Sequence, residues 1–150
     1  MVLSLRVSNP AFTVECRVGR VVEARLMTLR DADDVTQFAM AMRAAFMQLQ
    51  RKCVICADVR AFTLLSPTVS DLMIGVLAKG NPYLERSAIL LPAEGAAFHL
   101  QAARLVRESK SADRRAFRKP EEMAAWLDEV LDEGERAGVR AFLSEDKRPP

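Results

Sequence analysis

The segment CVICAD at positions 53–58 decides the fold of this 150-residue chain. It is a short, nearly unbroken apolar run that ends in a carboxylate, Asp58. A strand with one solvated face alternates apolar and polar residues, whereas a strand buried on both faces of a parallel sheet is apolar throughout. We therefore expect residues 53–57 to form a central parallel strand, with Asp58 at the carboxyl edge of the sheet.

Amphipathic segments on both sides of this strand predict helices. Over residues 32–51, apolar side chains recur at spacings of three and four, and the aspartates within 31–34 suit the positive end of a helix. Ser66 followed by Pro67 predicts an N-cap and a first helical position, and residues 80–82 (GNP) predict the end of that second helix. Its expected buried stripe consists of Val69, Leu72, Met73, Val76 and Leu77.

The segments before residue 32 and after residue 82 predict further strands and helices. Residues 12–16 and 21–26 predict an opening hairpin around Gly19. Residues 87–91 predict a second buried strand, and Phe98, Ala102, Leu105 and Val106 predict a helix behind it. Residues 113–117 predict a weaker strand at an edge of the sheet. Residues 120–131 predict a helix whose buried face includes Trp126.

The order of these predicted strands and helices indicates an α/β fold, in which a β-hairpin is followed by alternating α/β units. We expect a mixed, mostly parallel sheet of about five strands, covered by about four helices. The expected domain spans residues 12–134, with residues 1–11 and 135–150 as N- and C-terminal extensions. Within the second extension, residues 135–143 predict a short helix anchored by Phe142 and Leu143, and residues 144–150 predict disorder.

Composition argues against several classes of partner. Lys and Arg number 22 against 20 Asp and Glu, a net charge of +2 that does not favour nucleic-acid binding. No apolar run approaches the roughly 20 residues of a membrane span, and residues 1–10 do not resemble a secretory signal. We therefore expect a cytoplasmic protein without a membrane span.

The reactive residue types do not form a catalytic or metal-binding motif. Cys53 and Cys56 form a C-x-x-C pair inside a strand, where residues three apart point to opposite faces, so we expect buried, reduced thiols there and at Cys16. His99 is the single histidine, and we expect it to be bonded locally. These patterns predict no catalytic residue, no metal site and no cofactor.

The element order and the segment ADVRAFTLLSPT at positions 57–68 together resemble the STAS domain. This is the fold of anti-sigma-factor antagonists and of the cytoplasmic tails of sulfate transporters. Residues 115–118 (RAFR) and 125–127 (AWL) look like the closing strand and helix of the divergent antagonist-like branch of the family. The resemblance covers roughly residues 12–133.

The resemblance implies a bacterial regulatory protein that binds another protein, such as a kinase-like signalling partner. In regulatory members an aspartate ends the central strand, and a serine or threonine that opens the next helix is phosphorylated. Asp58 matches the first position, and Thr68, with Ser66 beside it, falls nearest the second. The family's aspartate-serine-serine-glycine sequence is absent, because residues 66–69 read SPTV, and this departure weakens the expectation of phosphorylation.

Two surfaces are predicted to bind a partner. One is the loop with Asp58, Arg60, Ser66 and Thr68, which we expect to be exposed at the carboxyl edge of the sheet. The other is a basic block over residues 104–119 that includes Arg114 and Arg115, and it could bind an acidic partner or a second copy of the chain as a homodimer.

An alternative function is the binding of an apolar small molecule or lipid, and a small enzyme is the third and least supported hypothesis. An enclosed apolar cavity of several hundred cubic ångströms would favour the binding protein. A packed interior with an exposed apolar patch would favour the interaction module.

Overall fold

The computed structural model describes residues 4–145 and has an α/β fold built on a six-stranded mixed sheet. The strands are β1 (Leu5–Ser8), β2 (Phe12–Cys16), β3 (Val21–Leu26), β4 (Cys53–Asp58), β5 (Leu84–Leu90) and β6 (Arg114–Phe117). The α-helices are α1 (Ala32–Leu49), α2 (Pro67–Gly80), α3 (Ala96–Glu108), α4 (Pro120–Asp128) and α5 (Glu133–Ser144), and a short 3₁₀ helix, η1 (Asn81–Tyr83), follows α2. The predicted fold class is confirmed, with one more strand and one more α-helix than expected.

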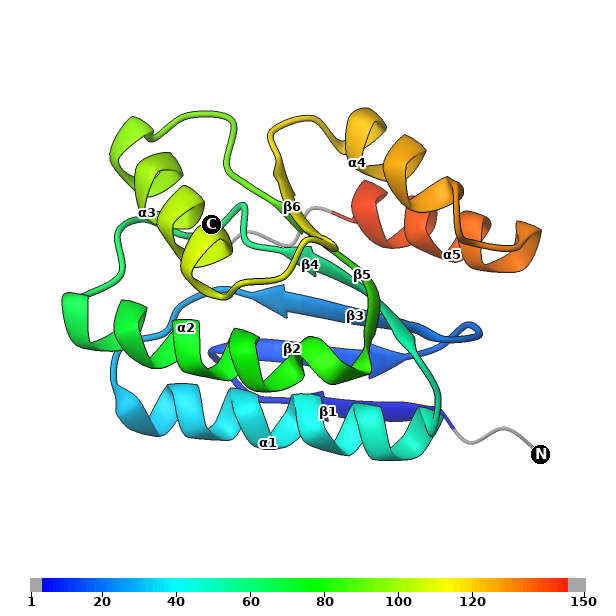
Figure 1. Cartoon of the computed structure of the whole chain (residues 1–150), viewed down its shortest axis with the longest axis horizontal. Coiled ribbons are helices and arrows are strands. Elements are labelled where there is room, and N and C mark those ends of the chain that lie inside the picture. The colour runs from blue at the N-terminus through cyan, green and yellow to red at the C-terminus, as the bar shows by residue number, and fades with distance from the viewer. Residues whose placement is uncertain (1–3, 146–150) are drawn as a thin grey trace.

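The strands lie in the sheet in the order in which they occur in the chain. β1, β2 and β3 pair antiparallel, and β3 to β6 pair parallel. Each right-handed crossover moves one strand in the same direction, so α1, α2 and α3 all cover one face of the sheet. The opposite face is covered by α4 and α5 (Figure 1). β6 is an edge strand, as predicted.

β4 lies at the centre of this arrangement and is buried at all six positions, which confirms the prediction for its sequence. Its side chains divide between two apolar cores. Cys53 and Ile55 belong to the core beneath α1, α2 and α3, whereas Val54 and Cys56 belong to the core beneath α4 and α5. The two thiols of the C-x-x-C pair therefore lie on opposite sides of the sheet, as the spacing predicted.

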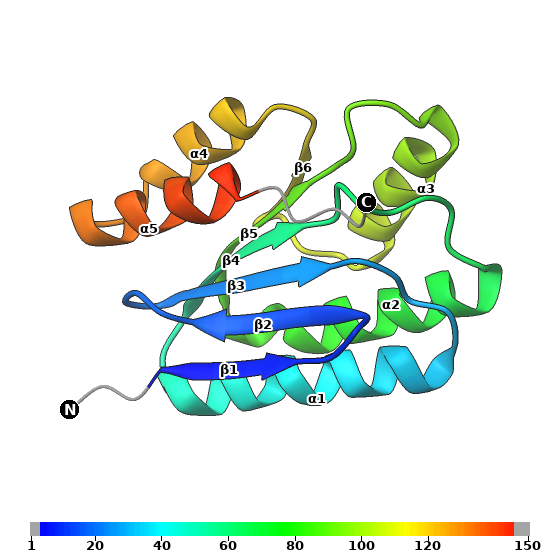
Figure 2. The same cartoon turned by 180° about the vertical axis from the view of Figure 1, so that it is seen from behind.

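The N-terminal residues contribute a strand that the sequence analysis placed in an extension. Residues 5–8 pair with β2 as the edge strand β1 (Figure 2). The turn between the two strands is stabilised by the Asn9 side chain, whose Oδ1 accepts hydrogen bonds from the backbone N–H groups of Ala11 and Phe12 at 2.8 and 3.0 Å. A four-residue strand followed by Asn-Pro carries too short an alternation to be recognised reliably.

Helix α5 is part of the second core. The short helix predicted for residues 135–143 is confirmed, and both of its predicted anchors, Phe142 and Leu143, are buried. Its first turn forms a capping box between Asp132 and Glu135. Glu135 is itself buried and accepts a hydrogen bond from the Arg20 backbone N–H at 2.9 Å, which joins α5 to the β2–β3 hairpin. Of the segment predicted to be disordered, residues 146–150 lie outside the described residues, and Ser144 ends α5.

Several side chains predicted to be buried are not, among them Val76 and Leu77 of α2, which are half-buried. Trp126 is half-buried at the rim of the second core, whereas Met123 and Leu127, predicted on the same face of the helix, are buried together with Ala124. Its ring is contacted by the guanidinium groups of Arg86 and Arg115, which lie 4.5 and 5.2 Å from the ring centroid. Leu72, expected in the buried stripe of α2, is 40% exposed.

The placement of α5 gives a stability prediction. Phe142→Ala should lower the free energy of unfolding by about 3–5 kcal/mol, because it removes a buried ring from the second core. Leu100→Ala, at a position that is 75% exposed, is the matched control and should change it by about 0.5 kcal/mol or less. Urea unfolding measures both, and equal effects of the two substitutions would contradict the packing of α5.

Candidate functional site

The predicted docking loop begins at a buried ion cluster. Asp58, the last residue of β4, accepts a hydrogen bond from Arg25 Nη1 at 2.5 Å. It also accepts from Arg60 Nε and Nη2 at 3.0 and 2.9 Å, and from the Arg60 backbone N–H at 3.0 Å. Arg25 comes from the neighbouring position on β3, since Arg25 and Asp58 are register partners. We call Arg25, Asp58 and Arg60 the ion cluster.

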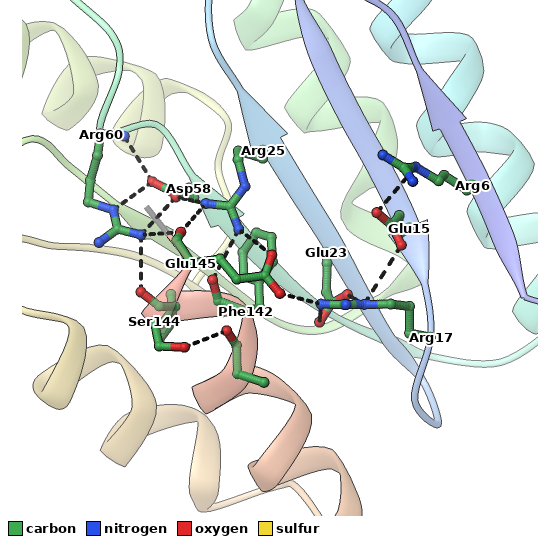
Figure 3. Close-up of polar contacts among 12 residues, drawn as sticks. Arg6, Glu15, Arg17, Glu23, Arg25, Asp58, Arg60, Phe142, Ser144 and Glu145 are labelled. Atoms are coloured by element: carbon green, nitrogen blue, oxygen red, sulfur yellow. Dashed lines mark hydrogen bonds and ion pairs between the residues drawn. The ribbon is translucent and has the colours of Figure 1, made fainter. Parts of the chain in front are cut away.

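The ion cluster holds the carboxyl end of α5. Arg25 donates to the carbonyl oxygens of Phe142 and Glu145 at 3.0 and 2.7 Å, and Arg60 donates to that of Leu143 at 3.1 Å (Figure 3). The last carbonyls of a helix have no partner within the helix and carry partial negative charge, so cationic side chains stabilise them. The cluster therefore attaches α5 to the carboxyl edge of the sheet.

A second group of charged side chains lies next to the ion cluster on the same face of the sheet. Arg17 pairs with the buried Glu23 at 2.6 Å, and it approaches Glu15 and Glu145 at 3.7 Å each (Figure 3). Burial raises the pKa of Glu23, although the hydrogen bond from Arg17 opposes this rise. Glu145 also lies 3.5 Å from Arg25, which connects the two groups. The charges in this region compensate one another.

The exposure predicted for Asp58 is wrong. Its side chain is 5% exposed and Arg60's is 16% exposed, so Asp58 cannot offer its carboxylate to a partner in this conformation. The reason is the arginine at the end of β3: a carboxylate beside two guanidinium groups can be buried, because its hydrogen-bonding capacity is satisfied. Partner binding by Asp58 and Arg60 stays a prediction.

Removal of the carboxylate should destabilise the fold. We expect Asp58→Ala to lower the free energy of unfolding by about 3–5 kcal/mol, because it removes the buried carboxylate nearest to Arg25 and leaves only the more distant, partly exposed Glu145. Asp113→Ala, which removes a carboxylate from an exposed position, is the control and should cost about 0.5 kcal/mol or less. An Asp58→Ala protein as stable as the control would contradict the structural role of the cluster.

Ser66 and Thr68 lie apart from the ion cluster, at the start of α2 in the other helical layer. Both residues are exposed, as expected. Ser66 is the N-cap, since its side chain accepts a hydrogen bond from the Val69 backbone N–H at 3.2 Å, and Pro67 occupies the first turn. The four loop residues predicted to form one docking edge are therefore divided between the two faces of the sheet.

The two arginines predicted to share a basic surface also point to opposite faces, as neighbours on a strand must. Arg115 is exposed and lies over Trp126, whereas Arg114 is buried, so its expected exposure is wrong. Arg114 donates to Asn81 Oδ1 at 2.9 Å, to Ser109 Oγ at 2.8 Å and to Leu77 O at 3.2 Å. Desolvation lowers its pKa to about 10. It joins the C-terminal ends of α2 and α3 to β6.

An internal cavity of about 90 Å³ lies between the sheet and helices α1, α2 and α3. Its lining is apolar except for Ser87 and Arg114. A cavity of about 150 Å³ holds one benzene molecule. The cavity is therefore too small for an acyl chain, and it falls short of the several hundred cubic ångströms that would favour a lipid carrier.

A wider hollow is a surface groove of about 690 Å³ between α1 and α2. Its lining is mostly apolar, and the large apolar side chains Met40, Leu72 and Tyr83 that line it are 62, 40 and 36% exposed. Tyr83 stacks on Phe46, with ring centroids 4.7 Å apart. We call this feature the α1–α2 groove. This groove was not predicted from the sequence, although a glycine within the predicted helix, Gly75, is visible there.

The remaining candidates for chemistry have structural partners or are buried. The ring Nε2 of His99 lies 2.7 Å from Pro92 O, which confirms the predicted local bond. All three cysteines are free and buried. Desolvation is the main cause that raises the pKa of all three thiols, and that of Cys16 rises to about 11.

These thiols should react slowly in the native protein. At pH 8 only about 0.1% of Cys16 would be thiolate, since its pKa lies about three units higher. An aromatic disulfide reagent should therefore label native protein over hours and urea-unfolded protein within minutes. Rapid labelling of both Cys53 and Cys56 in native protein would contradict their placement in β4.

Comparison with known proteins gives no match: no family model fits the chain, and no curated protein and no solved structure is significantly similar to it. Within residues 4–145, no three His, Cys, Asp or Glu side chains are grouped so that they could hold a metal ion. None of the helices in that range is both long and apolar enough to cross a membrane.

Proposed function

We propose that this protein is a non-enzymatic interaction module that regulates or scaffolds another protein in the cytoplasm, and that the partner docks in the α1–α2 groove. The observation that carries this proposal is the exposure of Met40, Leu72 and Tyr83 on the walls of one groove. Single exposed apolar side chains are common on proteins, but apolar side chains gathered around a concave surface are typical of protein interfaces.

Two further observations favour binding of a protein over the rival functions. The internal cavity is too small for a lipid, whereas the groove on the surface has a volume of about 690 Å³. The cysteines are buried with raised pKa values and His99 is bonded to a backbone carbonyl, so these side chains are poorly suited to nucleophilic or general-base chemistry. The STAS resemblance points to the same functional class.

Phosphorylation, which the STAS resemblance implies, would act near this groove. Thr68 is exposed and precedes Leu72 by one helical turn, which places both residues on the same side of α2. A phosphate there would add about two negative charges beside one end of the groove. Within this proposal, modification of Thr68 would change which partners can dock.

The test compares two pairs of exposed apolar residues. Met40→Glu/Leu72→Glu introduces charge into the groove, whereas Leu64→Glu/Leu100→Glu introduces the same charge at residues that are 61 and 75% exposed and do not line it. Both proteins should unfold within about 1 kcal/mol of the wild type, because these are surface substitutions.

Affinity capture from the native host is then quantified for all three proteins by mass spectrometry. The partner that the wild type captures should fall by about tenfold or more with the groove variant and stay unchanged with the control. Capture that survives in the groove variant and is lost in the control would place the interface elsewhere.

A further inference from the structure

We infer that the α1–α2 groove receives an acidic amphipathic helix of the partner protein. This inference rests on the proposed function, and it specifies the chemistry of the partner. It draws on three features of the groove: its shape, the glycine at its centre and the charges on its walls.

The shape of the groove suits a third helix. α1 and α2 lie side by side on the sheet (Figures 1 and 2). Residues of both helices line the groove. Val35, Ala39 and Met42 line it from α1, and Val76 lines it from α2. A valley between two adjacent helices accepts the apolar ridge of another helix, whose side chains at i, i+3, i+4 and i+7 lie on one face.

Gly75 has no role in the isolated fold that requires a glycine. It lies within α2 and lines the groove, and a Cβ added there would meet no atom within 4 Å. Alanine would therefore fit and would favour the helix more strongly. The missing side chain instead leaves open space in the groove wall, where the backbone of an incoming helix can approach closely.

The charges on the walls favour an acidic partner. The groove is lined by two cationic side chains, Arg43 on α1 and Lys79 on α2, and neither forms a salt bridge within residues 4–145. The third charged lining residue, Asp71, pairs with Arg104 at 3.1 Å, and Arg104 also pairs with Glu108, so the lining itself carries two cations against one carboxylate. An apolar floor between two unpaired cations is complementary to an apolar stripe flanked by Asp or Glu.

A second copy of this chain is a poorer occupant. The acidic helix α4 carries Glu121 and Glu122, but it buries its apolar face, Met123, Ala124 and Leu127, in its own core. The helix α5 likewise buries Val139, Phe142 and Leu143. Neither helix of the described chain therefore has a free apolar stripe to place in a neighbour's groove.

Two designed helical peptides test the inference on the full chain. Each is about 18 residues long, like α1, and carries the same leucine stripe, flanked by glutamates in one peptide and by lysines in the other. Titration into ¹⁵N-labelled protein gives both the affinity and the amides that respond. The glutamate peptide should shift amides of α1 and α2 and bind at least about tenfold more tightly than the lysine peptide. Arg43→Glu/Lys79→Glu should reverse that order.

A matched pair of variants tests the role of Gly75. Gly75→Gln fills the open space and should weaken the glutamate peptide by about tenfold or more, while its melting temperature equals or exceeds that of the wild type. Ala78→Gln, at an exposed position of α2 that does not line the groove, should leave the affinity unchanged. Weaker binding in a protein that is no less stable cannot be attributed to misfolding.

Several outcomes would overturn the inference, and they are distinguishable from failure of the proposed function. Equal binding of the two peptides, or wild-type affinity in Gly75→Gln, would reject the acidic helix. If Met40→Glu/Leu72→Glu still lost the native partner, docking in the groove would stand with a different occupant. Concentration-dependent dimerisation, abolished by the same groove substitutions in sedimentation experiments, would assign the groove to a second copy and reject the inference.

Discussion

Burial of every side chain of β4 means that both faces of the sheet must be covered. The connections between parallel strands cover only one face, because the three crossovers all move in the same direction along the sheet. The second face, with Val54 and Cys56, depends on the helices after β6. α4 covers β5 and β6, and α5 reaches β3. The position of α5 is therefore as important to the fold as the sheet itself.

The polar interactions that fix α5 explain why the predicted docking loop is largely structural. Glu135 holds its beginning to the β2–β3 hairpin, and the ion cluster holds its end to the carboxyl edge of the sheet. Buried charges are costly unless they are paired and hydrogen-bonded, and here Asp58 is paired with Arg25 and Arg60. Arg114 serves a similar purpose in the other layer, where it bonds acceptors around the ends of α2 and α3. Asp58, Arg25 and Arg60 are hydrogen-bonded to one another or to the end of α5, and the more open surface for a partner lies between α1 and α2.

Local patterns predicted the elements, but they did not predict which side chains would meet. The apolar run at 53–57 and the Ser66-Pro67 pair each produced the expected element, because burial and helix capping are properties of a few neighbouring residues. The burial of Asp58 depends on Arg25, which is 33 residues earlier, and no local pattern reveals that contact.

Other features of the structure could have been predicted from the sequence. Arg114 and Arg115 are neighbours in a predicted strand, and strand geometry alone separates them. Asp132 and Glu135 have the spacing of a capping box, which marks the start of α5. Gly75 within an otherwise regular helix marks the groove, but its meaning depends on the neighbouring α1 and therefore on the tertiary structure. The predicted burial of Trp126 is wrong because the face of α4 towards the core includes Ala124 beside Met123 and Leu127, which leaves Trp126 at the rim.

In-cell photo-crosslinking tests the central claim, docking of a protein in the α1–α2 groove, most directly. A photoreactive phenylalanine replaces Met40 in the groove or Leu100 outside it, and both positions are exposed enough to accept it. The account predicts a covalent adduct with another protein from position 40 and none from position 100. An adduct from position 100 alone, or an adduct from position 40 only with a second copy of this chain, would contradict it.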